Sequence, residues 1–224
     1  MEVEYRSDAE ADRILVRCAD PALSLALVEL YFRNEGDAYV KRFPPGSVTD
    51  EMLDRFRAAL LPLLRQAARL DSVPWARALH EAAGRLDRAS VDWWLAGSGA
   101  LAVRGLQVGP RDLDLVVSED HALRASAALE DVLIEPSVAA AWPVSRWFGR
   151  AWLGARVEWV AGVYATVDQP FPTDFGPAAA ASLDLVEWEG FAVRVPSLEL
   201  QRDVSAQRGL TDRVALIDAL RGHS

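Results

Sequence analysis

The sequence predicts an α+β protein: a mixed central sheet flanked by helices, preceded by a small N-terminal α+β module. Three observations support this class. Short apolar stretches alternate with polar residues as in strands, longer stretches repeat apolar residues at helical spacing, and glycine- or proline-containing turns separate them. With 224 residues, of which 51% are hydrophobic, the chain can bury the core of one domain and an appendage. We divide it into residues 1–90 and residues 91–224.

The first part predicts a β-rich unit over residues 1–46 and a helical unit over residues 49–88. The β-rich unit has four expected strands, of which the last two form a hairpin around a turn: Met1–Ser7, Arg13–Cys18, Leu23–Arg33 and Ala38–Phe43. In the helical unit, Thr49 caps a first helix and Pro74 opens a second, which ends near Arg88. Nothing here supplies a reaction, so a helper domain and a docking surface both stay open as roles.

The second part predicts strands and helices in mixed order. The expected elements are the strand Val91–Ala96, the helix Ser98–Arg104, the strand Asp112–Val117, a helix from Ser118 to about Leu133, two strands within Arg146–Val163, the hairpin of Leu183–Trp188 with Phe191–Val195, and the helices Ser197–Gln207 and Thr211–Leu220. A parallel sheet would need a regular alternation of strands and helices. The second part instead contains strands that follow one another as hairpins, which favours a mixed sheet.

Composition excludes several classes of function. Cys18 is the only cysteine, so neither an internal disulfide nor a cysteine-based zinc site can form. No apolar stretch reaches membrane-spanning length and no leader is visible, so we expect a cytoplasmic protein without a membrane partner. The net charge is −9, most of it in the second part, which disfavours nucleic acid as a partner. Such an acidic surface is either simply solvated or suits a cationic substrate, or a metal ion with a nucleotide.

The stretch WWLAGSGALA, residues 93–102, is an apolar strand that turns at glycines directly into a helix. Such a turn can hold a phosphate, because glycine lets the backbone approach and the helix offers free N–H groups. It also fits the G-x-G-x-x-A pattern of dinucleotide-binding folds, but the next strand does not end in the acidic residue which that fold needs. A phosphate-loop ATPase is excluded because Gly-Lys-Ser/Thr does not occur. The residues after the turn therefore decide its chemistry.

Two aspartates open the next expected strand, in the run RDLDLVV. Asp112 and Asp114 point to the same face of a strand, with Cα atoms roughly 6.6 Å apart. Two like charges at this spacing repel each other, and one or two magnesium ions shared between them would remove the repulsion. The alternative is a pair of solvent-facing aspartates at the end of a strand.

The glycine turn and the aspartates together resemble the signature of the DNA polymerase beta-type nucleotidyltransferase superfamily, in its small, minimal or aminoglycoside adenylyltransferase-like members. The signature is a hydrophobic residue followed by Gly and Gly or Ser, then a spacer, then alternating acidic and hydrophobic residues. Here it is Ala96-Gly97-Ser98, thirteen residues over Gly99–Arg111, then Asp112-Leu113-Asp114-Leu115. The family also places a third carboxylate on a later strand. Glu158 in Val157-Glu158-Trp159-Val160 is the best match, although Asp is more usual there.

The resemblance implies a nucleotidyltransferase fold and a role for each of these residues. Asp112 and Asp114 would hold Mg²⁺, as one ion or a pair, and with it the phosphates of a nucleoside triphosphate. Gly97 and Ser98 would contact the triphosphate from the turn. Glu158 would bind a second ion or take the proton from an acceptor hydroxyl, which attacks the α-phosphate and releases pyrophosphate.

The acceptor and the phosphate-binding cations are open at this point. The candidate cations are Arg104, Arg111 and Arg208, with Arg202 and Arg213 also in the tail helices. A small hydroxylated or cationic acceptor suits the acidic charge of the second part, while a protein or a tRNA 3′ end remains an option. A different class also stays open, in which the fold is a nucleotide-binding or protein-interaction module that transfers nothing.

Overall fold

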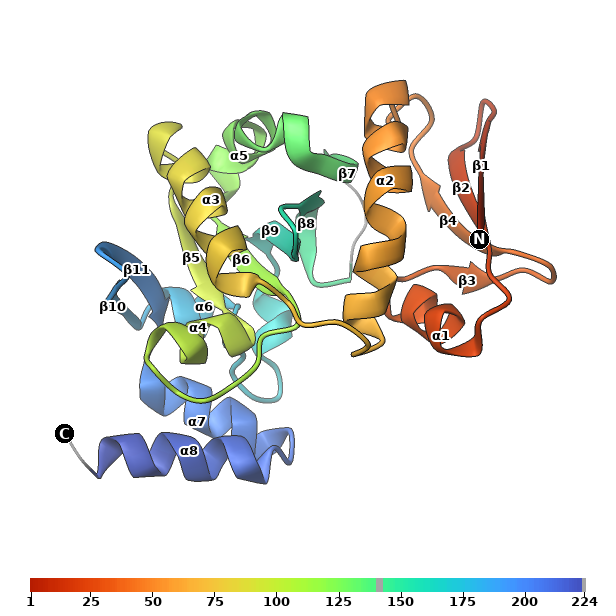
Figure 1. Cartoon of the computed structure of the whole chain (residues 1–224). Coiled ribbons are helices and arrows are strands. Elements are labelled where there is room, and N and C mark those ends of the chain that lie inside the picture. The colour runs from red at the N-terminus through yellow and green to blue at the C-terminus, as the bar shows by residue number, and fades with distance from the viewer. Residues whose placement is uncertain (140–142, 223–224) are drawn as a thin grey trace.

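The computed structural model describes residues 1–139 and 143–222, and it begins with an antiparallel four-stranded sheet (Figure 1). In the sheet order β1-β2-β4-β3, these strands are Glu2–Ser7, Asp12–Arg17, Tyr39–Phe43 and Arg33–Asn34. Ile14 and Val16 alternate along β2 and are buried in the core that this sheet shares with the next two helices. Three of the four strands that we expected in this unit are confirmed.

The expected strand Leu23–Arg33 is wrong, because most of this segment is the helix α1, Pro21–Glu29. Asp20 caps the helix by accepting hydrogen bonds from the N–H groups of Ala22 and Leu23, and Pro21 takes the first helical position. The buried residues of the segment have helical spacing: Leu23, Ala26, Leu27 and Leu30. The Asp-Pro pair was the signal for this helix.

The long helix α2, Asp50–Ala67, lies between the N-terminal sheet and the rest of the protein (Figure 1). Thr49 caps it as expected, since its side chain accepts a hydrogen bond from the N–H of Met52. On one face α2 packs on the N-terminal core through residues such as Phe56 and Leu60. On another, Arg55 donates to the carbonyl of Leu133 over 2.8 Å. The N-terminal module is therefore joined directly to the second sheet of the protein.

That second sheet has five strands and is mixed, as we expected. In the order β5-β6-β9-β8-β7 its strands are Trp93–Ala96, Leu113–Val117, Arg156–Val163, Ser145–Trp152 and Leu133–Ala139. β6 and β9 are parallel, and the other neighbours are antiparallel. The expected helix from Ser118 to Leu133 is shorter, comprising α5, Ala122–Ala128, between two single 3-10 turns, Glu119–His121 and Glu130–Val132.

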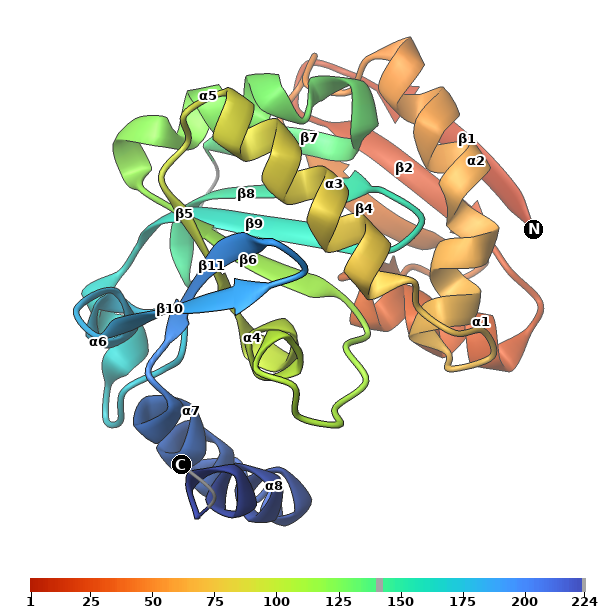
Figure 2. The same ribbon diagram turned by 60° about the vertical axis from the view of Figure 1, so that its left-hand side comes forward.

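We did not expect β7, which takes the edge of this sheet. Pro136 falls within it, and proline is tolerated in edge strands because its missing N–H costs no ladder hydrogen bond. The helix α3, Trp75–Arg88, opens after Pro74 as expected and lies across one face of the sheet (Figure 2). Its residues Leu79 and Leu86 share a core with Leu95 and Trp159 of the sheet. α3 thus packs with the second sheet, and the division at residue 90 stays a prediction.

The remaining elements come after the five-stranded sheet in the chain, and the hairpin packs beside β5 (Figure 2). They are a 3-10 turn, Ala165–Asp168, the one-turn helix α6, Pro177–Ala180, the hairpin of β10, Leu183–Trp188, with β11, Phe191–Pro196, and the helices α7, Leu198–Gln207, and α8, Thr211–Arg221. The hairpin and both helices confirm the sequence analysis. Within the described residues, every helix is too short or too polar to cross a bilayer.

Candidate functional site

Strand pairing brings the glycine turn and three carboxylates together. β5 runs antiparallel to β6 with Ala96 opposite Asp114, so the turn that begins at Gly97 lies beside Asp114. β6 runs parallel to β9 with Asp114 opposite Glu158. The end of one strand and the beginnings of two others therefore meet at a single edge of the sheet. Glu158, which only the family resemblance had suggested, is brought there by register.

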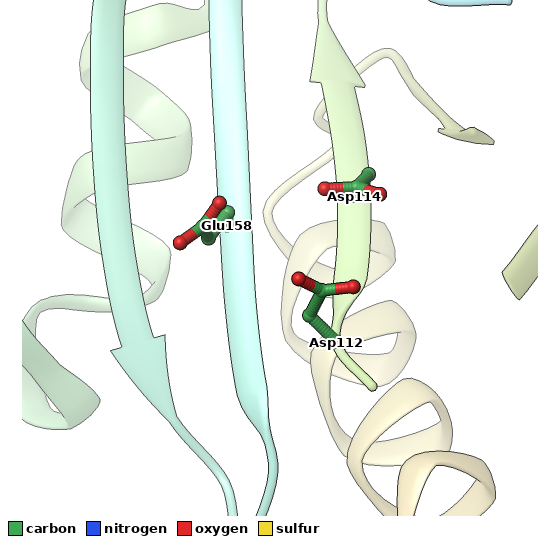
Figure 3. Close-up of side chains that lie close together, drawn as sticks. All are labelled: Asp112, Asp114 and Glu158. Atoms are coloured by element: carbon green, nitrogen blue, oxygen red, sulfur yellow. The ribbon is translucent and has the colours of Figure 1, made fainter. Parts of the chain in front are cut away.

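The three carboxylates form a compact group (Figure 3). One oxygen each from Asp112, Asp114 and Glu158 lies within 4.8 Å of the other two. Asp112 and Asp114 point from one strand and Glu158 from its neighbour (Figure 3). All three side chains are half-buried, and carboxylate oxygens are the ligands that Mg²⁺ prefers in proteins. The chemistry of the donors thus fits a hard divalent cation.

The protein environment acts in opposite directions on two of these carboxyl groups. Burial raises the pKa of Asp114 well above its usual value, and the negative charges of Asp112 and Glu158 raise it further. Burial alone would also raise the pKa of Glu158. The guanidinium groups of Arg150 and Arg156 outweigh that effect, and its pKa is lowered. Asp114 therefore carries an uncompensated electrostatic cost that a bound cation would relieve.

Gly97 is the residue of the turn that touches the carboxylates. Its φ of +63° lies in the left-handed region, and a Cβ atom there would be 2.5 Å from Oδ2 of Asp114. Its N–H donates to Oδ2 of Asp174 over 3.2 Å, and its carbonyl accepts from Gln201 over 3.3 Å. Asp174 precedes α6 in a loop, where no pattern in the sequence marked it.

A cleft of about 1000 Å³ opens in front of the carboxylates, between the N-terminal module and the five-stranded sheet. The sheet side contributes Gly97, Asp114 and Glu158. Residues of α1 and of the strands β3 and β4, or just next to them, form the other wall: Val28, Tyr31, Phe32, Arg33, Val40, Lys41 and Arg42. The sequence analysis had assigned no role to these residues, because only the packing of the module turns them toward the site.

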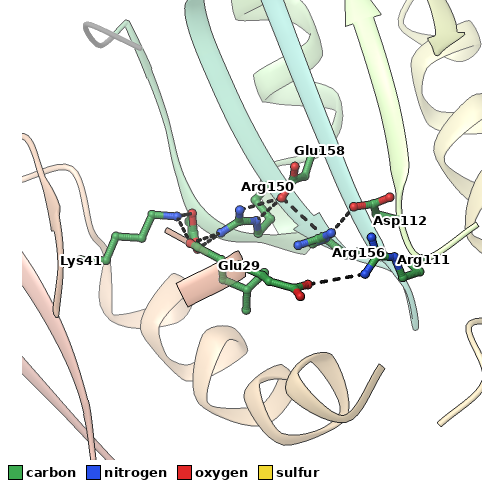
Figure 4. A network of polar contacts seen from close by, with 9 residues as sticks. Glu29, Lys41, Arg111, Asp112, Arg150, Arg156 and Glu158 are labelled. Carbon is green, nitrogen blue, oxygen red and sulfur yellow. Dashed lines mark hydrogen bonds and ion pairs between the residues drawn. The ribbon is translucent and has the colours of Figure 1, made fainter. Parts of the chain in front are cut away.

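The predicted phosphate-binding residues occupy different places. Arg208, at the end of α7, lines the cleft. Arg111 has its nearest ion-pair partner in Glu29 of α1, at 3.7 Å (Figure 4). Arg104 donates instead to Asp184 and to the carbonyl of Pro196, on the hairpin. Ser98 lies half-buried in the first turn of α4, Gly97–Val103. Of the three arginines, only Arg208 is placed among the described residues of the cleft wall, and the role of Arg104 stays a prediction that nothing here supports.

Behind the carboxylates lies a network of buried charges that the sequence analysis missed (Figure 4). Arg150 is fully buried and contacts both Glu158, over 2.6 Å, and Glu135 of β7. Lys41, the only lysine of the chain, pairs with the other oxygen of Glu135 over 2.5 Å. Arg156 in turn contacts Asp112. A continuous chain of ion pairs thus runs from the N-terminal module to the carboxylates.

No family model matches this chain, and a search of curated proteins returns no match. Solved structures do show similarity. A protein from Thermotoga maritima, provisionally described as a nucleotidyltransferase, is 20% identical with a TM-score of 0.49, over 66% of this chain and 93% of its own.

Two further structures give similar values. The antibiotic-resistance factor ANT(2″)-Ia, crystallised with adenylyl-2″-tobramycin, is 14% identical with a TM-score of 0.45, over 65% of this chain and 88% of its own. A nucleotidyltransferase-like antigen from Paracoccidioides brasiliensis is 16% identical with a TM-score of 0.42, over 66% and 78%. The solved structures to which this chain is similar are thus described as nucleotidyltransferases or as similar to them. Its function must be argued from its own residues.

Proposed function

We propose that this protein is a Mg²⁺-dependent nucleotidyltransferase, which moves a nucleoside monophosphate from a nucleoside triphosphate to a hydroxyl acceptor. The observation that carries the proposal is the meeting of Asp112, Asp114 and Glu158 beside the turn at Gly97. The group faces a cleft large enough for a nucleotide and a small partner. A purely structural role would not explain three carboxylates held together at the edge of a buried sheet.

The residues present fit the metal ion that this reaction needs. Asp112, Asp114 and Glu158 would hold it, since all are oxygen donors and burial and the nearby negative charges raise the pKa of Asp114. Because Gly97 has no side chain, the space next to the carboxylate of Asp114, which a Cβ atom would fill, stays open. When bound, Mg²⁺ offsets phosphate charge and favours attack at the α-phosphorus.

The residues that line the cleft suggest where the two substrates bind. We place the triphosphate near Gly97, with Ser98 next to it in the chain, because Gly97 lines the cleft and Arg208 supplies a cation at its wall. Tyr31 and Arg33 of the N-terminal module line the same cleft as Glu158. We place the acceptor on this side of the cleft, with its hydroxyl toward the carboxylate group, one of whose members takes up the proton. The module then has a function as the acceptor wall.

The wall also indicates the chemistry of the acceptor. The module contributes cationic residues, Arg33, Lys41 and Arg42, together with aromatic and aliphatic side chains. Among the described lining residues, the acidic ones all come from the sheet side: Asp114, Glu158 and Asp174. From the charge of the sequence we expected a small hydroxylated or cationic acceptor, and this wall suits a hydroxylated molecule with an apolar body better than a polycation.

A second candidate function is nucleotide binding without transfer. The observation in its favour is that Arg150 and Arg156 already contact Glu158 and Asp112, so part of the carboxylate charge is balanced by the protein itself. A sensor would bind a nucleotide in this cleft and release no pyrophosphate. The two candidates therefore differ in turnover.

The test is calorimetric titration of ATP, GTP, CTP and UTP with and without Mg²⁺, combined with an assay for pyrophosphate release. We expect Mg²⁺-dependent binding in the parent and at least a 100-fold loss of turnover in the Asp112→Asn/Asp114→Asn double variant. Binding without pyrophosphate release, in the presence of a panel of hydroxyl acceptors, would favour the sensor. Equal Mg²⁺-dependent binding by parent and variant would show that the site is wrongly placed.

A further inference from the structure

Two arginines are built into the carboxylate group, and this arrangement limits how many metal ions it can hold. Arg150 has no exposed side-chain surface, which is unusual for arginine, and its guanidinium is paired with two carboxylates. It contacts Oε1 of Glu135, and its Nη1 donates to the carbonyl of Leu30 over 3.3 Å. Lys41 holds the second oxygen of the same Glu135. Arg150 therefore cannot turn away from Glu158 without breaking a buried network.

The contacts of the arginines fall on one oxygen of each carboxylate. Oε1 of Glu158 lies 2.8 Å from Nε and 2.6 Å from Nη2 of Arg150, and 3.6 Å from Nε of Arg156. Arg156 also donates to Oδ2 of Asp112. These contacts do not involve Oε2 of Glu158, Oδ1 of Asp112 or the carboxylate of Asp114. An arginine keeps its charge at any physiological pH, so both cations are permanent.

A pair of metal ions needs more oxygens than this. Two ions in such sites lie about 4 Å apart and share carboxylates that give one oxygen to each ion. A second ion bridged by Glu158 or Asp112 would lie beside the guanidinium of Arg150 or Arg156, and their positive charges would repel it. The net charge of the group also favours a single ion. The guanidinium groups of Arg150 and Arg156 offset two of the three carboxylate charges. One divalent cation is enough to balance the rest.

We propose that the site binds a single divalent cation, and that Arg156 takes the position and the charge of a second one. Arg150 is a positioning residue that holds Glu158 for this arrangement. This inference rests on the proposed function, which requires a metal at these carboxylates but is indifferent to the number of ions. It also gives the N-terminal module a second role, because Lys41 helps to hold Arg150 through Glu135.

The test counts metal ions directly. The full-length protein, saturated with the non-hydrolysable analogue α,β-methylene-ATP, is titrated with Mn²⁺, and free Mn²⁺ is measured by electron paramagnetic resonance against a blank without protein. We expect one ion per chain beyond the blank in the parent. Arg156→Gln should bind a second ion and hold the first on the order of tenfold more tightly, since a positive charge next to it is gone.

Matched variants separate charge from structure. Arg156→Lys keeps the charge and should bind one ion. Arg85→Gln removes another partly buried arginine, which lies on α3 and pairs with Asp131 and Glu81, and should behave as the parent. If Arg156→Gln does not fold, Arg156→Met gives the same count with a side chain of similar length. Melting curves show which variants are folded.

The outcomes distinguish this inference from the proposed function. Two ions in the parent would overturn the inference and leave the nucleotidyltransferase proposal intact. A count of one in folded Arg156→Gln, or of two in Arg156→Lys, would likewise overturn it. No specific Mn²⁺ in any variant would remove the metal site, and with it both proposals.

Discussion

Two groups of buried charges lie side by side in this protein, and they are built in opposite ways. In the network of Lys41, Glu135 and Arg150, the signs alternate and each charge meets an opposite one. In the group of Asp112, Asp114 and Glu158, the signs are the same. Arg150 belongs to the first group and also contacts the second. Its guanidinium offsets the charge of Glu135 in the ion-pair network and that of Glu158 in the candidate active site.

This difference separates charges that stabilise the fold from charges that mark a candidate site. Buried ion pairs that satisfy one another need no external partner, and they join the N-terminal module to the sheet. Buried like charges are costly, as the raised pKa of Asp114 shows, and proteins keep them where a ligand supplies the missing charge. The imbalance of charge, more than the burial, marks the functional group.

We expect the largest effect on stability from a substitution that breaks the network of Lys41, Glu135 and Arg150. Glu135→Gln leaves Lys41 and Arg150 as neighbouring buried cations, so we expect the free energy of unfolding to fall by about 3–5 kcal/mol. Urea unfolding measures it. The matched control is Glu35→Gln, which removes the exposed bidentate partner of Arg42 and should cost under about 1 kcal/mol. If both variants lose a similar amount of unfolding free energy, burial does not increase the contribution of this ion pair to stability.

We expect a smaller effect from a substitution that tests how closely the glycine turn approaches the carboxylate group. Gly97→Ala combines a strained positive φ with a contact on Asp114, so we expect a loss of roughly 2–3 kcal/mol and of Mn²⁺ binding. Gly105→Ala is the control, because its φ is +86° but no atom lies within 4 Å of the added Cβ. It should lose about 1 kcal/mol and bind Mn²⁺ normally. If both variants bind Mn²⁺ equally well, the close approach of Gly97 to Asp114 is irrelevant to the metal.

The smallest effect is the pH dependence of the network. Burial lowers the pKa of Lys41 from 10.5 to about 8, with a further contribution from the charge of Arg150. Between these values the unfolded chain binds more protons than the folded one, so stability rises with pH. Relative to Lys41→Met, the parent should gain at most about 1.4 kcal/mol per pH unit above pH 8. Unfolding at pH 8.0 to 9.5, below the titration of Tyr31, measures this, and a flat difference would mean that Lys41 keeps an ordinary pKa.

Much of the fold follows from local signals that the sequence carries. Thr49 caps a helix where we expected it, and the helix that we expected to begin at Ser197 is capped by that residue. Alternation along RDLDLVV correctly predicts that Leu113 and Leu115 enter the core. Each of these signals lies within a few residues of the structure that it specifies.

The errors have equally specific causes. The run LSLALVELYFR was interpreted as a strand from its apolar content, whereas the cap at Asp20 and the spacing of Leu23 and Leu27 indicate a helix. The edge strand β7 contains Pro136, which argues against a strand unless its place at the edge of the sheet is already known. In the first case a local signal was overlooked, and in the second the sequence held none.

The sequence by itself determined the local half of the site: a glycine turn free to approach a carboxylate, and two aspartates on one face of a strand. Only the tertiary structure decided that Glu158 lies opposite Asp114, that Arg150 and Arg156 are set among the carboxylates, and that the N-terminal module closes the cleft. Side-chain alternation and backbone freedom are properties of neighbouring residues. Pairing between distant strands depends on how the whole chain packs, which no local pattern records.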